Sequence, residues 1–492
     1  MRTTRRSLLI AGAASLVAAR ARAADEDLRP RPRAPGGTGG SGGGPGAAPP
    51  DSLDAIFARS GLRPSTGFVV VDLETGATLE AEAPDVPRPP ASVQKIVTAL
   101  YAHETLGQDY RFATRLLATG PIGGGRLDGD LVLAGDGDPT LDTDALGALV
   151  AGLRAGGVAA VAGRLRVAEG ALPVSEAVDD AQPADAAYNP GVSGLNLNFN
   201  RVFAGWKAGG DGLAFSAPGE RFEVAVDGIR GEAADVALPA RRLTDDAEIW
   251  TLPRAGMRRS GSLWLPVAHA GRYAGEVFRG LAGQRGLILP QAERVSAPPA
   301  GALVGLGLSP PLDTILRDML RFSTNLTAEV VGLRASQARG LAPAGFAPSA
   351  AAMAGWAGGR GLDPAHLVNH SGLSGAARVT PAALARFLQS AAPTALPELM
   401  PSRPILDDAG KPAEIDVTAR VKTGTLDFAS GLAGYLTGRR RLGFAILVAD
   451  LDRRAALGPA ERADPPGGDA WTARARRQEQ ALLRRWARVY VG

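Results

Sequence analysis

The sequence predicts a mixed α/β (α+β) fold, in which helices flank a sheet and a large, mostly β region is inserted. Two observations predict this fold. β-prone segments lie towards both ends of the chain, at residues 66–84 and 418–450, and helical segments separate them. Residues 113–301 instead alternate Gly-punctuated β-prone runs with occasional helical stretches. We therefore expect the two ends of the chain to build one sheet, with residues 113–301 inserted between them.

The first 50 residues carry targeting signals rather than a hydrophobic core. Residues 1–23 combine a positively charged start, a short apolar run and an Ala-x-Ala cleavage pattern, which predicts a signal peptide. Arg5-Arg6 resembles a twin-arginine signal and favours export to the periplasm in the folded state, with a general secretory signal as the alternative. Residues 24–50 are rich in Gly and Pro and predict a linker.

Folded sequence is expected from residue 51 onwards. Residues 66–84 hold two β-prone runs around Glu74-Thr75-Gly76, which predicts a hairpin. Helices are expected after Pro89-Pro90 and again from residue 310. Near the C-terminal end we expect three strands, at residues 418–426, 430–437 and 441–450, followed by a basic helix. The expected domains are 51–112 joined to 302–492, with 113–301 inserted.

Composition excludes several classes of protein. The chain has no cysteine, which excludes disulfides, thiolate catalysis and Cys-ligated zinc. Its four histidines show no metal-binding spacing, so we expect neither a metal nor an organic cofactor. No apolar run approaches the roughly 18 residues of a membrane-spanning helix, so we expect no membrane span. The basic C-terminal end is interpreted as a solvated helix face, and without a reader motif it does not predict nucleic-acid binding.

The first chemical motif is Ser92-Val93-Gln94-Lys95, an S-x-x-K at the start of a predicted helix. Positions three apart share one face of a helix, so the Lys95 amine can reach the Ser92 hydroxyl. A serine hydroxyl is a poor nucleophile until a neighbouring base takes its proton. A neutral lysine can act as that base when burial or a second cation lowers its pKa.

Two further motifs follow in order. Ser323-Thr324-Asn325 is an S-x-N between helical stretches, and Lys422-Thr423-Gly424-Thr425 lies on a predicted strand. The chain contains 54 Lys and Arg residues, of which only four are lysine, and two of those four lie in these motifs. Each motif alone is a weak signal, because short patterns occur by chance. Their order, their secondary structure and the scarcity of lysine together indicate one active site.

The trio of motifs resembles the penicillin-binding proteins and the serine β-lactamases. The 231 residues between the first two motifs, and the 99 between the second and third, resemble the class C low-molecular-mass penicillin-binding proteins, the D-alanyl-D-alanine carboxypeptidase/endopeptidase family. The strings LVLAGDGDPTL (131–141), SGLNLNFN (193–200) and HSGLSG (370–375) agree with this resemblance. It implies a β-lactamase/transpeptidase-like antiparallel sheet and an exported serine D,D-peptidase.

The resemblance also implies a role for each motif residue. Ser92 would attack the carbonyl of a D-Ala-D-Ala bond in a peptidoglycan peptide or crosslink, with Lys95 as its base. Ser323 would relay a proton to the leaving amine, and Asn325 would hold the substrate amide. Lys422 and the hydroxyls of Thr423 and Thr425 would bind the terminal carboxylate. The backbone N–H groups of Ser92 and Thr425 would form an oxyanion hole. The residues expected to bind substrate are Asn325, Lys422, Thr423, Gly424 and Thr425. β-Lactam antibiotics would act as inhibitors.

Three positions depart from the pattern of the relatives. Asn369-His370 stands where relatives often have Asp-Gly, and Gly375 stands where they often have Arg. In the inserted region relatives tend to carry an acidic pair, whereas only Glu169 is acidic here. These changes leave the chemistry untouched and bear on recognition of the peptide side chain.

Two other functions compete with the D,D-peptidase. A β-lactamase-type hydrolase shares the acylation step but needs a Glu that activates the deacylating water, and the sequence offers none at an identifiable position. A non-catalytic wall-binding protein would not require Lys95. The intact trio and the long insertion favour the peptidase.

The scarcity of lysine generates a prediction for Lys95 and Lys422. Lys95→Arg should abolish acylation by penicillin, with a loss of more than about 10³-fold, because a guanidinium with a pKa above about 12 cannot act as a base. Lys422→Arg should retain measurable acylation, about 10- to 100-fold reduced, because it keeps a positive charge at altered geometry. Acylation rates, with circular dichroism to confirm folding, provide the measurement. Equal rates for the two variants would show that another group is the base.

Overall fold

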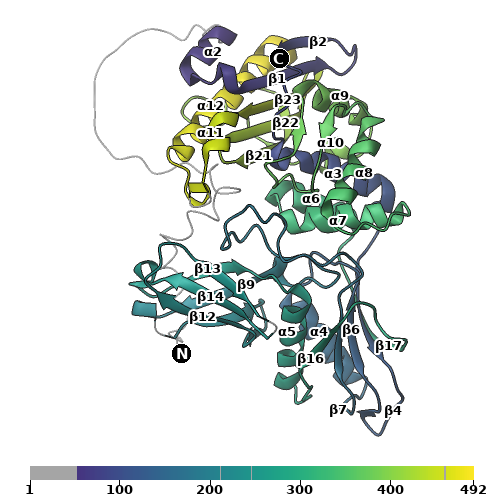
Figure 1. Ribbon diagram of the computed structural model, residues 1–492. Coiled ribbons are helices and arrows are strands. Elements are labelled where there is room, and N and C mark those ends of the chain that lie inside the picture. Colours follow the sequence, from purple (N-terminus) through teal and green to yellow (C-terminus); the bar gives the residue numbers. More distant parts are fainter. Residues whose placement is uncertain (1–51, 211, 245, 459–460) are drawn as a thin grey trace, which may run out of the picture.

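The computed structural model describes residues 52–492 except 211, 245, 459 and 460 (Figure 1). The predicted signal peptide (1–23) and the predicted linker (24–50) lie outside the described residues. Within the described ranges, no helix is long and apolar enough to cross a membrane.

The sheet predicted from the two ends of the chain is present as one antiparallel, six-stranded sheet. Its strand order is β2-β1-β23-β22-β21-β20, so the first hairpin pairs directly with the last strand. Phe68 of β1 lies opposite Ile446 of β23, almost the whole length of the chain away. The strands are β1 (Thr66–Asp72), β2 (Thr78–Glu82), β20 (Ser402–Arg403), β21 (Thr418–Leu426), β22 (Ala429–Thr437) and β23 (Arg441–Ala449). The predicted fold class is therefore confirmed.

Helices cover both faces of this sheet, which explains why β23 reads as a continuous apolar run. On one face, Trp471 and Trp486 pack against the aromatic rings of Phe428 and Phe444. That face is covered by α2 (Leu53–Ser60) and α12 (Gly468–Trp486). The opposite face is covered by α3 (Lys95–Leu106), α6 (Leu312–Phe322), α7 (Asn325–Ala338), α8 (Phe346–Gly358) and α9 (Pro381–Ala391). Helix α3 runs through the middle of this layer, and its first eight residues are all buried.

The inserted region forms a separate lobe beneath α6 and α7, with a hydrophobic core of its own (Figure 1). Its largest sheet has the order β16-β8-β6-β3-β17 and packs against α4 (Thr143–Ala155) and α5 (Ala270–Gln284). The strands of that sheet are β3 (Ala113–Ala118), β6 (Leu131–Gly135), β8 (Leu165–Ala168), β16 (Ala292–Val295) and β17 (Ala302–Leu308). Two smaller sheets lie within residues 201–266 and have the orders β11-β10-β9-β15 and β12-β14-β13. Their strands are β9 (Arg201–Trp206), β10 (Ala214–Pro218), β11 (Glu223–Ala225), β12 (Ile229–Ala234), β13 (Ala240–Leu243), β14 (Glu248–Pro253) and β15 (Gly261–Pro266).

The end of the inserted region lies later in the chain than the sequence suggested. Strand β17 pairs with β3, so residues 302–308 belong to the sheet of the insertion rather than to the six-stranded sheet. Pro310-Pro311 separates this strand from the helix that follows it, but nothing in the sequence assigns the strand to the sheet of the insertion. We therefore propose residues 113–308 as the inserted region.

A half-buried carboxylate joins the first hairpin to the C-terminal helix. Glu80 of β2 accepts hydrogen bonds from the Arg485 guanidinium (2.6 Å), the Trp486 indole (3.0 Å) and the Tyr490 hydroxyl (2.9 Å). Burial alone would raise the pKa of Glu80, but these donors outweigh burial and hold that pKa below its ordinary value of 4.5. The ionised carboxylate therefore stabilises the folded state.

Substitution of Glu80 should lower stability in a pH-dependent way. Glu80→Gln should reduce the free energy of unfolding at pH 7 by about 1–3 kcal/mol, because it leaves buried donors without a charged acceptor. Because the folded-state pKa is depressed, this contribution is present above the unfolded value of 4.5 and is lost as the pH falls through the folded value. Denaturant unfolding of both proteins from pH 7 to pH 3 should therefore show two converging curves. A pH-independent difference would contradict the role of the charge.

Candidate active site

The S-x-x-K motif lies in a tight turn that leads into the buried helix α3. Residues Ala91–Gln94 form one turn of 3₁₀ helix, and Lys95 begins α3. Ala91 has a φ of 48°, in the left-handed region that residues with a side chain rarely adopt. This turn leaves Ser92 half-buried at the end of the helix while Lys95 is fully buried.

The Lys95 amine meets three oxygen atoms from three parts of the chain. Its Nζ lies 2.8 Å from Ser92 Oγ, 2.7 Å from Asn325 Oδ1 and 2.8 Å from the Ser371 carbonyl oxygen. Burial, together with the positive charge of Lys422, holds the pKa of Lys95 well below its ordinary value of 10.5. The negative charge of Glu329 acts in the opposite direction. The geometry is that of a lysine able to lose its proton beside a serine.

The S-x-N motif connects α6 to α7. Ser323 ends α6 with a φ of 59°, and Asn325 is the first residue of α7. The Asn325 side chain is held at both ends, because Oδ1 accepts from Lys95 and Nδ2 donates to the Tyr188 carbonyl (2.9 Å). Ser323 Oγ instead accepts a hydrogen bond from Lys422 Nζ (2.9 Å). The strained left-handed turn thus directs the serine and the asparagine towards different lysines.

The K-T-G motif lies on β21, directly beside the turn that carries Ser92. A Cβ atom added to Gly424 would lie only 2.9 Å from the Pro90 carbonyl oxygen and 3.0 Å from Ser92 N. Lys422 is buried, Thr423 is exposed and Thr425 is half-buried with its hydroxyl 3.3 Å from Arg476 Nη2. The absence of a side chain at Gly424 therefore permits the close approach of β21 to Ser92.

The structure brings the three motifs together from separate elements. Ser92, Lys95 and Asn325 form one hydrogen-bonded group, and Ser323 and Lys422 form a second group beside it. The electrostatic effect of Lys422 on Lys95 links the two groups. The remaining predicted residues follow Lys422 on β21: Thr423, Gly424 and Thr425.

Sequence reasoning missed two residues that support this group. Glu329 lies four positions after Asn325 on α7, so both residues share one helix face, and that spacing was the signal that could have identified it. Tyr188 comes from the inserted region, and its hydroxyl donates to Gln182 Oε1 (3.3 Å), while Gln182 Nε2 lies 3.4 Å from the Leu373 carbonyl oxygen. No local pattern in the sequence indicates that the insertion reaches the site.

Two of the three departures from the relatives' pattern have structural explanations. The His370 ring lies against Gly332, where a Cβ atom would come within 2.2 Å of it, and its Nε2 is 2.8 Å from Ser349 Oγ. Burial lowers the pKa of His370 to about 3, so the ring is neutral at physiological pH. At the second position, a Cβ atom on Gly375 would lie 2.6 Å from Arg454 Nη2.

The third position, Glu169, is engaged within the inserted region. Its carboxylate pairs with Arg294 Nε at 2.6 Å and accepts a hydrogen bond from Gly271 N at the start of α5. Glu169 is almost completely buried, so its carboxylate has a structural role in the packing of α5.

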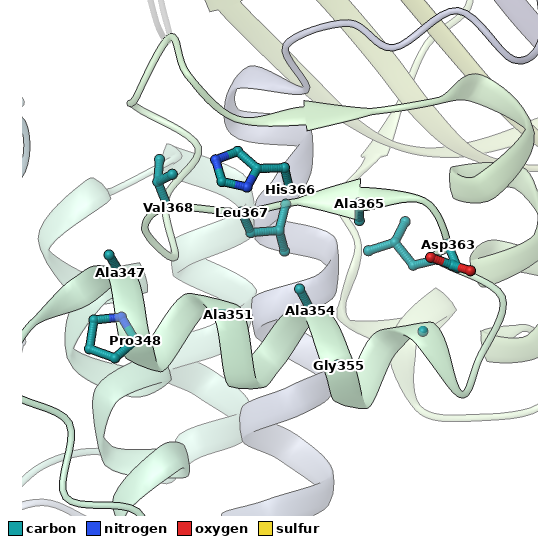
Figure 2. Close-up of a pocket in the computed structure, with 12 residues that line it drawn as sticks. Ala347, Pro348, Ala351, Ala354, Gly355, Asp363, Ala365, His366, Leu367 and Val368 are labelled. Atoms are coloured by element: carbon teal, nitrogen blue, oxygen red, sulfur yellow. The ribbon is translucent and has the colours of Figure 1, made fainter.

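One groove lies away from the three motifs. It has a volume of about 730 Å³ and lies between α8 and residues 362–368 (Figure 2). Its lining is mostly apolar, with Asp363 and His366 as the polar members, and it includes no residue of the three motifs. Among the described residues, no group of three or more His, Cys, Asp or Glu side chains could hold a metal ion.

The fold and the three convergent motifs define the class of serine enzymes with an S-x-x-K nucleophile motif and a transpeptidase-like fold. The crystal structure of penicillin-binding protein 4 (DacB) from Haemophilus influenzae has a similar fold, with a TM-score of 0.69 and 20% identity. That match covers 90% of this chain and 100% of the other. Residues 50–464 match the D-Ala-D-Ala carboxypeptidase 3 (S13) family, and the chain belongs to this family.

Curated relatives agree with the family. A D-alanyl-D-alanine carboxypeptidase from Actinomadura sp. is 34% identical over 199 residues, which cover 39% of this chain and 34% of that protein. A carboxypeptidase from Mycobacterium tuberculosis is 29% identical over 396 residues, which cover 77% of this chain and 75% of that protein. The chain thus spans about a third of the first relative and three quarters of the second. The resemblance inferred from the motifs, and with it the class of serine D-Ala-D-Ala carboxypeptidases, is confirmed.

The close approach of Gly424 to the serine turn generates a prediction. Gly424→Ala should reduce the rate of acylation by penicillin by about 100-fold, because an added methyl group forces the strand away from Ser92. Overpacking at this position should cost about 1–3 kcal/mol in stability, which leaves the protein folded. Gly355→Ala on α8 provides the matched control, since a Cβ there meets no atom within 4 Å. An acylation rate for Gly424→Ala equal to that of the control would refute the requirement for close approach.

Proposed function

We propose that this protein is a serine D,D-carboxypeptidase that hydrolyses the terminal D-Ala-D-Ala bond of peptidoglycan peptides through an acyl-enzyme on Ser92. The observation that carries this proposal is the fully buried Lys95 amine, 2.8 Å from the Ser92 hydroxyl and with a lowered pKa. A buried lysine that can lose its proton is the base that a serine nucleophile requires.

The two other contacts of Lys95 orient it for this role. A neutral amine has two N–H groups and one lone pair. The Asn325 and Ser371 oxygen atoms accept the two N–H groups, so the lone pair faces the Ser92 hydroxyl. In the acylation step Lys95 takes the hydroxyl proton while Ser92 Oγ bonds to the substrate carbonyl carbon. The backbone N–H groups of Ser92 and Thr425 would stabilise the oxyanion.

The second group of residues serves the leaving D-alanine. When the tetrahedral intermediate collapses, the C–N bond breaks and the amine accepts a proton relayed through Ser323. Lys422, which hydrogen-bonds to Ser323, would provide positive charge for the terminal carboxylate, and the Thr423 and Thr425 hydroxyls would add hydrogen bonds. Water then hydrolyses the ester, releases the shortened peptide and restores the Ser92 hydroxyl.

The proposed substrates extend to D,D-crosslinks. The scissile bond of such a crosslink also follows D-alanine, so an endopeptidase reaction uses the same chemistry. Strand β20 pairs only with residues 419 and 420 of β21, which leaves the K-T-G part of this strand for an extended substrate chain. We therefore include D,D-endopeptidase activity in the proposal.

The competing functions receive less support. A β-lactamase-type hydrolase needs a carboxylate that activates water beside the acyl-enzyme, whereas Glu329, the carboxylate coupled to Lys95, directs both oxygen atoms to backbone N–H groups. A wall-binding protein without catalysis has no use for a buried lysine of lowered pKa. The periplasm is the proposed location, reached by the twin-arginine route, because Arg5-Arg6 starts a signal pattern and peptidoglycan lies outside the cytoplasm.

Two measurements test this proposal together. Fluorescent penicillin should label the purified protein and fail to label Ser92→Ala, because a β-lactam carbonyl acylates the same hydroxyl. Incubation with peptidoglycan fragments should release free D-alanine, and cleavage of crosslinked dimers should yield monomers, both identified by mass. Equal labelling of the two proteins would remove Ser92 as the nucleophile, and unchanged fragments would remove the peptidase activity.

A further inference from the structure

A buried carboxylate behind the nucleophile lies outside the mechanism described so far. Glu329 on α7 is completely buried, and its two oxygen atoms accept hydrogen bonds from consecutive backbone N–H groups. Oε2 lies 2.9 Å from His370 N, and Oε1 lies 2.8 Å from Ser371 N. A buried charge is costly unless such donors compensate it, so the carboxylate and residues 370–371 hold one another in place.

The same stretch of backbone contacts the catalytic lysine from its other side. The Ser371 carbonyl accepts a hydrogen bond from Lys95 Nζ at 2.8 Å, and Gly372 N donates to Asn369 Oδ1 at 3.0 Å. Gly372 lies directly on the nucleophile turn, because a Cβ atom there would come within 2.0 Å of the Ala91 carbonyl oxygen. The segment 369–373 is therefore clamped between α7 and the serine turn.

Glu329 also acts on Lys95 through its charge. Three ionisable groups act on one another in this part of the fold: Lys422, Lys95 and Glu329. Lys422 opposes a positive charge on Lys95, and Glu329 favours one. His370, which packs against the same segment, is neutral and adds no charge. Burial raises the pKa of Glu329 to about 7, so its charge changes in the physiological range.

We propose that Glu329 is a positioning residue for Lys95: its carboxylate fixes the Ser371 carbonyl that orients the amine, and its charge sets how readily the amine holds a proton. This inference rests on the proposed role of Lys95 as the base. When Nζ takes the Ser92 proton, an N–H bond forms, the O–H bond breaks, and an ammonium group remains. The Glu329 carboxylate then stabilises that ammonium through the intervening peptide group, without itself touching the substrate.

The test is the pH dependence of acylation by fluorescent penicillin. In Glu329→Gln the negative charge is lost, so the pKa of Lys95 falls and the acidic limb of the rate profile should move to lower pH by one unit or more, the size of a single neighbouring charge. The plateau should fall by about 10- to 100-fold, because the new NH₂ group faces a backbone N–H and loosens the Ser371 carbonyl. Glu329→Asp keeps the charge and should keep the limb near its wild-type position.

A matched control exists on the opposite side of the sheet. Glu479 of α12 is also a fully buried glutamate with its pKa raised by burial to about 7, and its Oε1 accepts from Ser430 Oγ at 2.6 Å. Glu479→Gln removes a comparable buried charge that does not act on Lys95, so its acidic limb should stay in place. A limb that moves equally in Glu479→Gln and Glu329→Gln, or in neither, overturns the proposal.

A measurement on the unsubstituted protein covers the case in which Glu329→Gln does not fold. The chain has only four lysines, so ¹³Cε labelling of lysine gives four side-chain signals. The Lys95 signal should titrate in two steps between pH 5 and 10, because its protonation is coupled to that of Glu329. A single step overturns the coupling. Failure of Ser92→Ala to abolish labelling would instead overturn the proposed function, so the two failures are distinguishable.

Discussion

The Lys95 amine lies in the interior with no exposure to solvent, yet in the role proposed for it the amine passes between two protonation states. Removal of an ammonium from water costs several kcal/mol unless partners compensate it, and that cost is what lowers its pKa. The rest of the catalytic domain supplies the partners at fixed distances: a side chain at the start of α7, a backbone carbonyl from the segment before β19 (Arg378–Val379), and the serine itself. Each of these elements is held by its own contacts, so the reactivity of one serine depends on packing across the whole domain.

The fold predicted from the sequence agrees with the structure where the signal was local or strongly apolar. The hairpin at residues 66–84, the buried strand at 441–450 and the helix after Pro90 follow from periodicity and turn residues. That strands from the two ends of the chain build one sheet followed from their β-prone character, whereas the direct pairing of β1 with β23 is known only from the structure. The boundary of the insertion did not follow, because β17 is assigned by its partner β3 rather than by anything in its own sequence.

The residues of the candidate site also divide into those that the sequence predicts and those that only the structure identifies. Ser92, Lys95 and Lys422 were accessible to sequence reasoning because spacing and the scarcity of lysine mark them. Tyr188 was not, since its role arises from a contact between elements that are distant in the chain, and Glu329 was marked only by its spacing from Asn325. Glu169 shows the converse: an acidic residue at a suggestive place proves to be part of an ion pair with Arg294. Residue type and order identified the groups proposed to react, whereas tertiary contacts identified most of the groups that hold them.

The pairing of the first hairpin with the last strand has a consequence for the order in which the domain can form during synthesis. Strands β21, β22 and β23 lie within the last eighty residues of the chain. Strand β1 can pair only with β2 until β23 has emerged. The insertion adds little to the entropy of that closure, because each doubling of a loop costs only about 0.6 kcal/mol. The insertion does increase the sequence separation between β1 and β23, and contacts between distant segments slow folding. A chain that ends before β21 therefore lacks the K-T-G strand beside Ser92.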